Sequence, residues 1–160
     1  EICKKILQSL LKHVIAFIQN KELIIDAILE GYKKKVRFIE LKKSLPYQEH
    51  LFFTKPEELF IHPSEGDSSK SYKFLDELLF VIYPKMRGDN IQWYLECVPK
   101  KFGEYENRKS MPNEWGGKQG DELAAITGIP GTLFCHKALF LCSAKSREDI
   151  YKLLELALKN

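Results

Sequence analysis

The sequence predicts an α+β fold, with a largely antiparallel sheet packed on helices and an N-terminal helical extension. Three observations predict it. Residues 79–100 have the pattern of a β-hairpin, and apolar side chains recur at helical spacing over residues 2–18 and again over residues 150–158. A chain of 160 residues, 44% of them hydrophobic, is long enough for one core with an extension. We therefore expect a helical connector at residues 1–35 and an α+β domain at residues 36–160.

The N-terminal segment is expected to be helical because its apolar residues form a broad stripe opposite lysines and other polar residues. A second stripe runs over residues 23–32. Asn20 lies between the two, where it would either cap a second helix or sit within one long, kinked helix.

The run of Lys33, Lys34 and Lys35 would suit a phosphate-steering patch. Cations also stabilise the C-terminal end of a helix, however, and we favour that interpretation.

The next segment is expected to contain one strand and one short helix. Residues 36–41 are β-prone, and residues 46–51 predict a turn followed by a short helical or irregular piece. His50 would suit a metal site or acid–base chemistry, but a lone histidine beside one glutamate is more often a hydrogen-bonded structural residue. Residues 56–73 contain the polar run EGDSSKS and predict a mobile loop.

The hairpin is the expected centre of the sheet. Its first arm contains the β-rich run FVIY, the run RGDN has turn chemistry, and the second arm alternates between apolar and polar residues. This alternation places Trp93, Leu95 and Cys97 on one face, toward the core. Pro84 and Pro99 lack a backbone N–H, so we expect them near strand ends or where pairing stops.

Residues 102–119 are expected to be irregular, because they are rich in Gly, Asn, Pro and charged residues. Tyr105, Arg108 and Trp115 stand within them. Loops on a rigid sheet often hold ligand contacts, whereas the alternative is that Trp115 only fills the edge of the core.

The C-terminal segment is expected to form two helices around β-structure. The first helix, residues 121–127, should be closed by Gly128 in a left-handed conformation. Residues 132–143 predict one strand or a tight pair. The last helix should begin after Ser146, which with Asp149 has the spacing of a capping box.

The overall composition indicates an intracellular, reducing environment. The net charge is only +3, from 25 basic and 22 acidic residues, so any nucleic-acid site must be local. We find no apolar run near 18 residues and no charged-then-apolar leader, and we expect neither a membrane span nor a signal peptide. The four cysteines show no disulfide-framework spacing and no CxxC pair: Cys3, Cys97, Cys135 and Cys142.

Several short motifs, taken together, resemble one family. They are PYQEHL, FVIYPK, CVPKK, ENR at residues 106–108, MPNEWGG, DELAAITGIPG, FCH and SRED. Their order and spacing resemble the C-terminal half of the melanocyte-proliferating-gene-product family, which is related to the DHH phosphoesterases. The resemblance implies a metal-dependent 3′–5′ RNA exonuclease of the nucleus and mitochondrion, or of the cytoplasm. It also implies that metal-binding Asp and His residues, with Mn or Mg, lie in an N-terminal half outside this sequence.

The resemblance also implies where substrate would bind. Arg108, His136, Ser146 and Arg147 fall on positions of the family pattern, and we expect them to contact substrate. A phosphate would suit the start of the last helix, although Ser146 and Asp149 would alternatively do no more than cap that helix. The chain departs from the family by having Cys142-Ser143 where the family has a glycine pair, which implies a weakened or altered contact.

We expect no catalytic residue, metal or other cofactor in this fragment. Two-metal phosphoryl chemistry needs several converging Asp and His groups, and the sequence offers no such cluster. Cys135 and His136 are adjacent and would point to opposite faces of a strand, which makes them a poor ligand pair. The chain alone is therefore expected to hydrolyse no RNA.

Two functions from different classes remain open. The first is an RNA- or nucleotide-binding half of a hydrolase. The second is a structural or interaction module that shapes the N-terminal half of the same protein, or its homodimer, without touching substrate. Clustering of Arg108, His136 and Arg147 in one cleft would favour the first function, and their dispersal the second.

Overall fold

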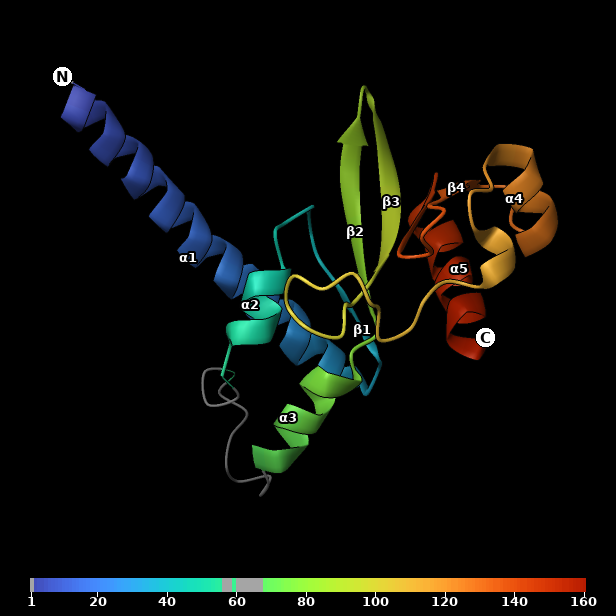
Figure 1. The fold of residues 1–160 in the computed structure, drawn as a ribbon, viewed down its shortest axis with the longest axis horizontal. Coiled ribbons are helices and arrows are strands. Elements are labelled where there is room, and N and C mark those ends of the chain that lie inside the picture. The colour runs from blue at the N-terminus through green and yellow to red at the C-terminus, as the bar shows by residue number, and fades with distance from the viewer. Residues whose placement is uncertain (1, 56–58, 60–67) are drawn as a thin grey trace.

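The computed structural model describes residues 2–55, 59 and 68–160 and confirms the predicted α+β fold (Figure 1). In these residues, five strands form one sheet in the order β1-β2-β3-β5-β4. The helices are α1 (Ile2–Lys34), α2 (Gln48–Phe53), α3 (Ser68–Glu77), α4 (Gly120–Thr127), α5 (Arg147–Lys159) and the short 3-10 helix η3 (Asn113–Trp115). The strands are β1 (Phe38–Glu40), β2 (Phe80–Arg87), β3 (Asn90–Cys97), β4 (Thr132–Cys135) and β5 (Leu141–Ala144).

The strands β2 and β3 are the two arms of the predicted hairpin. They pair antiparallel from Phe80 opposite Cys97 to Arg87 opposite Asn90. Gly88 in the turn has a φ of 59°, a conformation that glycine adopts without steric cost. β5 pairs antiparallel with β3, β4 pairs antiparallel with β5, and β1 pairs parallel with β2. The sheet is therefore largely antiparallel, as predicted.

A different helix covers each face of the sheet, because successive side chains of a strand point to opposite faces. Ile82 and Leu95 pack in one core with α5, and Trp93 lies partly buried against that core as expected. Val81 packs in a second core with the C-terminal part of α1. In Figure 1, α1 and α5 lie on opposite sides of the hairpin.

Pro84 lies within β2, at a place where pairing stops on one side. The parallel pairing of β1 with β2 ends at Glu40 opposite Ile82, whereas pairing with β3 continues past Pro84 opposite Trp93. The carbonyl of Ile82 accepts from the backbone N–H of Leu41 on the β1 side. Because alternate residues of a strand direct their backbone groups to the same side, Pro84 faces the unpaired edge and removes no ladder hydrogen bond.

The helix α1 is continuous through Asn20, so this residue caps no second helix and the alternative of one long helix is correct. The helix ends in a Schellman motif: Lys35 has a φ of 54° and donates to the carbonyl of Tyr32, and Val36 donates to that of Gly31. A Cβ at Gly31 would lie 3.0 Å from the carbonyl oxygen of Phe38. Glycine at this position therefore lets α1 approach β1 closely.

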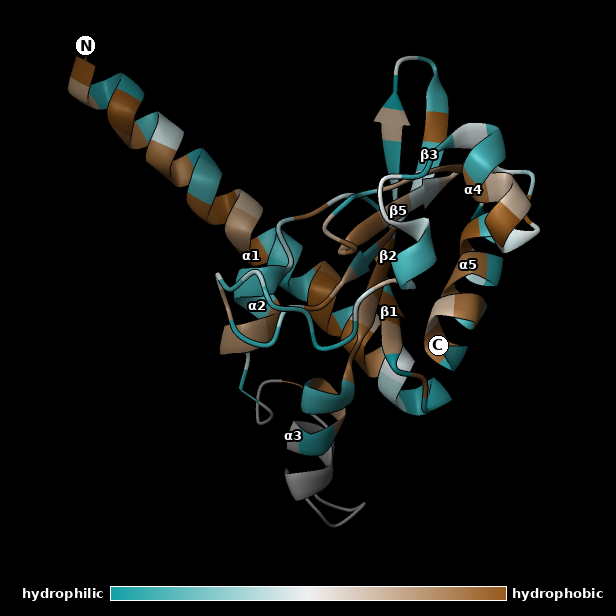
Figure 2. Cartoon of the chain, turned by 45° about the vertical axis from the view of Figure 1, so that its right-hand side comes forward, coloured by the Kyte–Doolittle hydropathy of each residue, from teal (hydrophilic) through white to brown (hydrophobic). Residues whose placement is uncertain are grey.

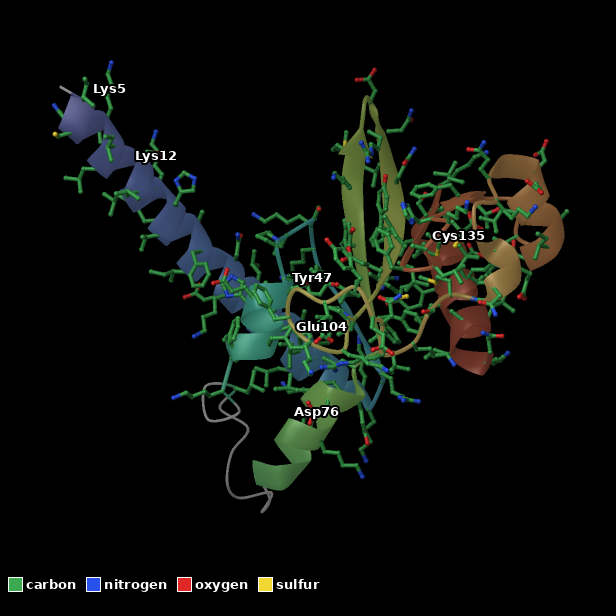
Figure 3. All side chains as sticks on the ribbon, in the orientation of Figure 1. Lys5, Lys12, Tyr47, Asp76, Glu104 and Cys135 are labelled. Carbon is green, nitrogen blue, oxygen red and sulfur yellow. The ribbon has the colours of Figure 1, made fainter. Side chains whose placement is uncertain are left out.

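The two halves of α1 have different surroundings. The C-terminal half packs on the sheet, with Ile24 and Ile28 fully buried. The N-terminal half projects from the body, with Lys5 and Lys12 far from the sheet (Figure 3), and Figure 2 shows apolar residues along this projecting part. Nine large apolar side chains between residues 2 and 18 are 44% to 76% exposed. Among the described residues, no helix has both the length and the apolarity that a membrane crossing requires.

Outside the sheet, the prediction was partly wrong for α3 and correct for the end of α4. Part of the loop predicted for residues 56–73 is helical, since α3 begins at Ser68; residues 56–58 and 60–67 lie outside the described residues. The helix α4 ends as predicted at Gly128, which has a φ of 71°. Trp115 is buried in the α5-side core, which agrees with the alternative that it fills the core.

Candidate functional site

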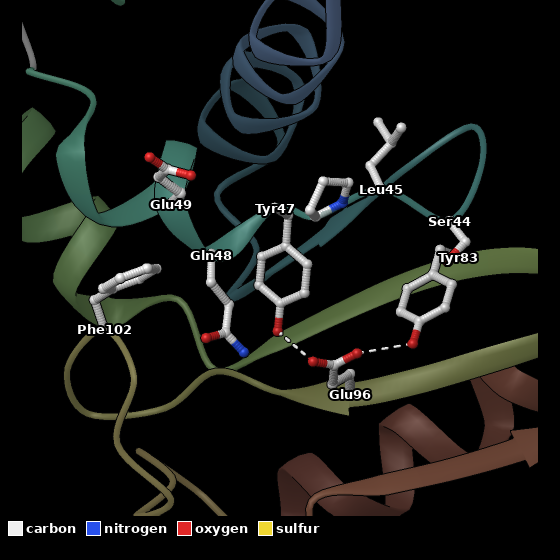
Figure 4. A pocket seen from close by; sticks show the side chains of 9 residues that line it. Ser44, Leu45, Tyr47, Gln48, Glu49, Tyr83, Glu96 and Phe102 are labelled. Carbon is white, nitrogen blue, oxygen red and sulfur yellow. Dashed lines mark hydrogen bonds between the residues drawn. The ribbon is translucent and has the colours of Figure 1, made fainter. Parts of the chain in front are cut away.

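A cleft of about 550 Å³ lies on the α1 side of the sheet, between the segment that leads into α2 and the strands β2 and β3 (Figure 4). Because this volume is within the usual range for small-molecule sites, the cleft is the main candidate site. Its lining combines aromatic, aliphatic and polar side chains: Ser44, Leu45, Pro46, Tyr47, Gln48, Glu49, Tyr83, Glu96 and Phe102.

The centre of the cleft is the carboxylate of Glu96, which two tyrosines hold in place. The hydroxyl of Tyr47 donates to Oε1 of Glu96 at 2.9 Å, and the hydroxyl of Tyr83 donates to Oε2 at 2.7 Å. Figure 4 shows the two phenols approaching the carboxylate from either side. Hydrogen bonds to a carboxylate are stronger than neutral ones, so this arrangement fixes the position of Glu96 and ties Tyr47 to the sheet.

Both tyrosines stay protonated. Burial and the neighbouring Glu96 carboxylate raise the pKa of Tyr83 well above its ordinary value, and the same two causes raise the pKa of Tyr47. Neither phenol is therefore suited to act as a general base near neutral pH. Their role in the cleft is to donate hydrogen bonds to Glu96.

An aromatic row, defined here as Tyr47, Tyr83 and Tyr94, continues from the cleft along the hairpin. The ring of Tyr83 stacks on that of Tyr94, with centroids 5.6 Å apart and planes 8° apart. The hydroxyl of Tyr94 accepts a hydrogen bond from Nε of Arg87 at 3.0 Å and donates one to Oε1 of Gln92 at 3.0 Å. The row thus joins the cleft to an exposed cationic side chain near the hairpin turn.

Ser143, which belongs to the pair expected to replace glycines of the family pattern, lies beside this row. It is opposite Tyr94 on β3 and Phe134 on β4, so the three side chains share one face of the sheet. The rings of Tyr94 and Phe134 are 6.4 Å apart. The Ser143 hydroxyl is buried and has no hydrogen-bond partner in the described part of the chain. A small residue between the two strands leaves room for the rings to meet.

Arg108 bonds within the chain. Its guanidinium donates to the carbonyls of Leu75, at 2.5 Å, and Leu78, at 3.0 Å, where α3 ends, and it lies 5.3 Å from the ring centroid of Phe52. Burial lowers the pKa of Arg108. These contacts hold the end of α3 against α2, because a cation bonded to the last carbonyls of a helix satisfies otherwise unpaired acceptors.

Ser146 and Arg147 also have partners within the chain. The Ser146 hydroxyl accepts from the backbone N–H of Asp149 at 3.1 Å and donates to its carboxylate at 2.6 Å, which is the helix cap expected from the sequence. Arg147 forms a bidentate ion pair with Glu40 of β1, at 2.6 and 2.7 Å. Burial alone would raise the pKa of Glu40, but hydrogen bonds from Arg147 and Tyr151 outweigh it and lower that pKa. The start of α5 is thereby tied to the edge of the sheet.

His136 is exposed in the turn between β4 and β5. Its Nδ1 accepts from the backbone N–H of Ala138 at 3.1 Å, and its ring contacts that of Phe140. Of the four expected substrate residues, none lines the cleft. Arg108 contacts the end of α3, Arg147 contacts β1, and His136 contacts its own turn, so the structure does not bring these three together through shared contacts.

His50 is buried and packs against α1. Its ring centroid lies 4.3 Å from that of Phe17. Burial lowers the pKa of His50, while Glu49 opposes this effect and Lys21 adds to it. This environment agrees with the structural role that we favoured for His50.

The described residues do not fit a metal centre. In this part of the chain, no three His, Cys, Asp or Glu side chains converge so that they could hold a metal ion. Cys97, Cys135 and Cys142 are free and buried, and burial raises the pKa of Cys97 to about 12 and that of Cys135 to about 11. Thiols in this state are poor nucleophiles and poor ligands.

Sequence reasoning missed the cleft, although part of the signal was present. The alternation over the second hairpin arm places Glu96 and Tyr94 on the face opposite Trp93. This alternation alone indicates that one face of β3, a central strand, carries polar groups. No local pattern, however, predicts that Tyr47 would reach Glu96, because their contact spans 49 residues of sequence.

Comparisons with known proteins point to one family. Residues 1–158 match the profile of MYG1_exonuc, described as "Uncharacterised protein family (UPF0160)". The human protein named "MYG1 exonuclease" is 28% identical over 148 residues, which are 91% of this chain and 35% of that protein. The yeast "MYG1 protein YER156C" is 27% identical over 145 residues, which are 89% of this chain and 38% of that protein.

A shorter and more similar match comes from a bacterium. "MYG1 protein" of Chlamydia muridarum is 45% identical over 69 residues, which are 42% of this chain and 24% of that protein. No solved structure matches the chain. The chain spans about a third of the length of the human relative and less of the chlamydial one.

Proposed function

Because the chain belongs to the MYG1 exonuclease family (UPF0160), we propose that it is the substrate-binding C-terminal half of a metal-dependent 3′–5′ RNA exonuclease. The observation that carries the proposal is the match of residues 1–158 to this family, together with relatives that are named exonucleases and are nearly three times as long as the matched region. In this proposal, this chain binds the RNA, and a part of the protein outside this chain carries out the hydrolysis.

We propose that the metal ions bind in the N-terminal half of the protein, outside this chain. Hydrolysis of a phosphodiester with two metal ions needs several carboxylate and imidazole ligands around each ion. Since the described residues offer no such group, we place Mn or Mg, and the cutting step, outside this chain. Buried, unpaired thiols suit a reducing compartment, and we place the protein inside the cell, in the nucleus and mitochondrion or in the cytoplasm.

Tyr83, the partly exposed member of the aromatic row, and the hairpin cations would contact RNA. Aromatic rings stack on bases regardless of sequence, and cationic side chains bind the phosphate backbone. Arg87 and Lys85 lie on the same face of β2 as Tyr83, since they are separated from it by even numbers of residues. Substrate contact by Arg108, His136, Ser146 and Arg147 stays a prediction. His136 and Arg147 are exposed, whereas Arg108 is partly buried and bonded to the end of α3.

The exposed half of α1 would join this chain to the rest of the protein. Nine large apolar side chains along one helix are more exposed surface than an isolated domain normally tolerates. We propose that the N-terminal half of the same protein packs on this surface.

RNA binding by the full-length protein tests the proposal. We expect weak, salt-sensitive binding of a short RNA that Arg87→Ala reduces roughly three- to tenfold, because one phosphate contact is lost. Lys159→Ala is the matched control, since Lys159 is exposed at the far end of α5, and it should leave binding unchanged. Absence of RNA binding at low salt, or equal effects of the two substitutions, would refute the substrate-binding role.

A second candidate function is that of a structural module. It is favoured by the internal contacts of Arg108 and Arg147, whose guanidinium groups both bond to other parts of the chain. In this case the chain would shape the metal-bearing half, or form a homodimer, through α1. Stable association without any effect of Arg87→Ala on RNA binding or turnover would favour this function, and sedimentation would separate the two kinds of association.

A further inference from the structure

We propose that the cleft formed by Tyr47, Glu96 and Tyr83 is a nucleobase pocket that prefers guanine. This inference rests on the proposed function, and it deepens it by assigning a base-selective subsite to the RNA substrate. The hydrogen-bonding capacity, the charge and the shape of the cleft each favour this base.

The floor of the cleft, formed by Tyr47, Tyr83 and Glu96, offers acceptors, and its two O–H donors are already used. Each phenol has a single O–H, and both O–H groups are already directed to Glu96. A carboxylate has about four lone-pair sites, so about two remain on Glu96 for a ligand. A ligand that reaches the floor must therefore bring N–H or O–H donors.

The charge of the cleft excludes the phosphate end of a nucleotide. A carboxylate repels an anion at short range, and the lining residues include a second carboxylate, that of Glu49. The base end of a nucleotide has no such penalty. Arg87, at the other end of the aromatic row, offers a separate place for a phosphate.

The walls of the cleft suit a flat ring. Tyr47 is almost fully buried, whereas Phe102 is 48% exposed at the rim and contacts the ring of Phe53. Stacking on an aromatic side chain is a main source of affinity for unpaired bases. Gln48 adds an amide at the rim that both donates and accepts hydrogen bonds.

Guanine matches the floor better than the other bases. Its N1–H and its 2-amino group donate side by side, as the two oxygens of one carboxylate accept side by side. Cytosine and adenine present one amino group next to an acceptor, and uracil presents one N–H between two carbonyl oxygens. Those acceptors would face the Glu96 carboxylate without a hydrogen bond.

Nucleoside titrations test this inference directly. We would titrate the 160-residue chain with guanosine, inosine and uridine and follow backbone amide chemical shifts. Inosine keeps N1–H but lacks the 2-amino group, so we expect it to bind about tenfold more weakly than guanosine, and uridine more weakly still. Shifts should centre on the lining residues of the cleft.

Two substitutions address the carboxylate. Glu96→Gln keeps the size of the side chain but replaces one acceptor oxygen by a donor, and it should abolish the preference for guanosine over inosine. Glu122→Gln is the matched control, because Glu122 is an exposed glutamate of α4 that pairs with Lys118. Tyr83→Phe keeps the ring and removes one hydrogen bond to Glu96, which should weaken guanosine binding severalfold. Thermal unfolding of each variant checks that it folds.

The outcomes separate this inference from the proposed function. Equal affinity for the three nucleosides, no binding of guanosine, or unchanged selectivity in Glu96→Gln would overturn the guanine pocket. RNA binding that is equally strong for uridine-only and guanine-containing oligonucleotides would also overturn it while leaving the proposed function intact. Selective guanosine binding without any RNA binding would support the pocket and count against the RNA-binding function.

Discussion

The two halves of α1 differ in what covers them, although both carry an apolar stripe. Around Ile24 and Ile28 the stripe is covered by the sheet and by α2, whereas between residues 2 and 18 it is exposed. Helical periodicity indicates that an apolar face needs a partner, but it does not say whether that partner belongs to the same chain. Four measurements test whether the two halves of α1 differ in solution as they do in the structure.

Truncating a buried isoleucine in the C-terminal half should destabilise the chain most. Ile28→Ala should lower the free energy of unfolding by about 2–5 kcal/mol, because it removes fully buried methyl groups and leaves a cavity. Ile6→Ala is the matched control in the exposed half and should change it by less than about 0.5 kcal/mol. Urea denaturation measures both. A large loss for Ile6→Ala would mean that the N-terminal half is covered in solution.

The next effect is from Gly31→Ala, at the contact of α1 with β1. The added Cβ would lie 3.0 Å from the carbonyl oxygen of Phe38, so the helix must move away from the strand. We expect a net loss of about 1 kcal/mol, since crowding of roughly 2 kcal/mol is partly offset by the better helix propensity of alanine. Ser9→Ala in the exposed half should not destabilise. An unchanged or higher melting temperature for Gly31→Ala would show that the contact is looser than described.

A smaller, pH-dependent effect is expected where His50 meets Phe17, at the boundary of the two halves. The pKa of His50 is lowered by burial, so the unfolded chain binds the proton more readily. Stability should therefore fall as pH drops below about 6.5, the ordinary pKa of histidine. Melting temperatures across this range should fall less in His50→Gln than in the unmodified chain. Parallel pH profiles for the two would contradict a contribution from His50.

The smallest effect on folding is expected from a polar substitution in the exposed half. Leu11→Gln should leave the free energy of unfolding within about 0.5 kcal/mol of its original value. It should nevertheless reduce self-association of the chain, because it interrupts the apolar surface. Light scattering at increasing concentration measures this, with Lys12→Gln as the control on the same helix. Unchanged association would show that the exposed stripe does not mediate it.

Local patterns predicted the elements whose determinants are close in sequence. The turn at Gly88, the left-handed cap at Gly128 and the cap at Ser146 each depend on residues within one turn of each other, and each is present. The family resemblance, carried by several short motifs in order, is confirmed by the match over residues 1–158.

Contacts between distant residues were not predictable in this way. Arg147 and Glu40 are 107 residues apart in sequence, and nothing near either one indicates the other. The same holds for Arg108 at the end of α3, a helix that begins within residues expected to form a loop. The family motifs predicted that these arginines contact substrate. Only the fold shows that both guanidinium groups bond to other residues of the chain.

The position of Pro84 has a consequence for how the hairpin behaves at high protein concentration. In the part of the chain that the structure describes, the outer edge of β2 is unpaired beyond Ile82. Such an edge normally offers N–H and C=O groups on which another chain can build a strand. Pro84 removes one of those N–H groups, and the charges of Lys85 and Arg87 follow directly. The hairpin can therefore keep one exposed edge without becoming a template for edge-to-edge aggregation.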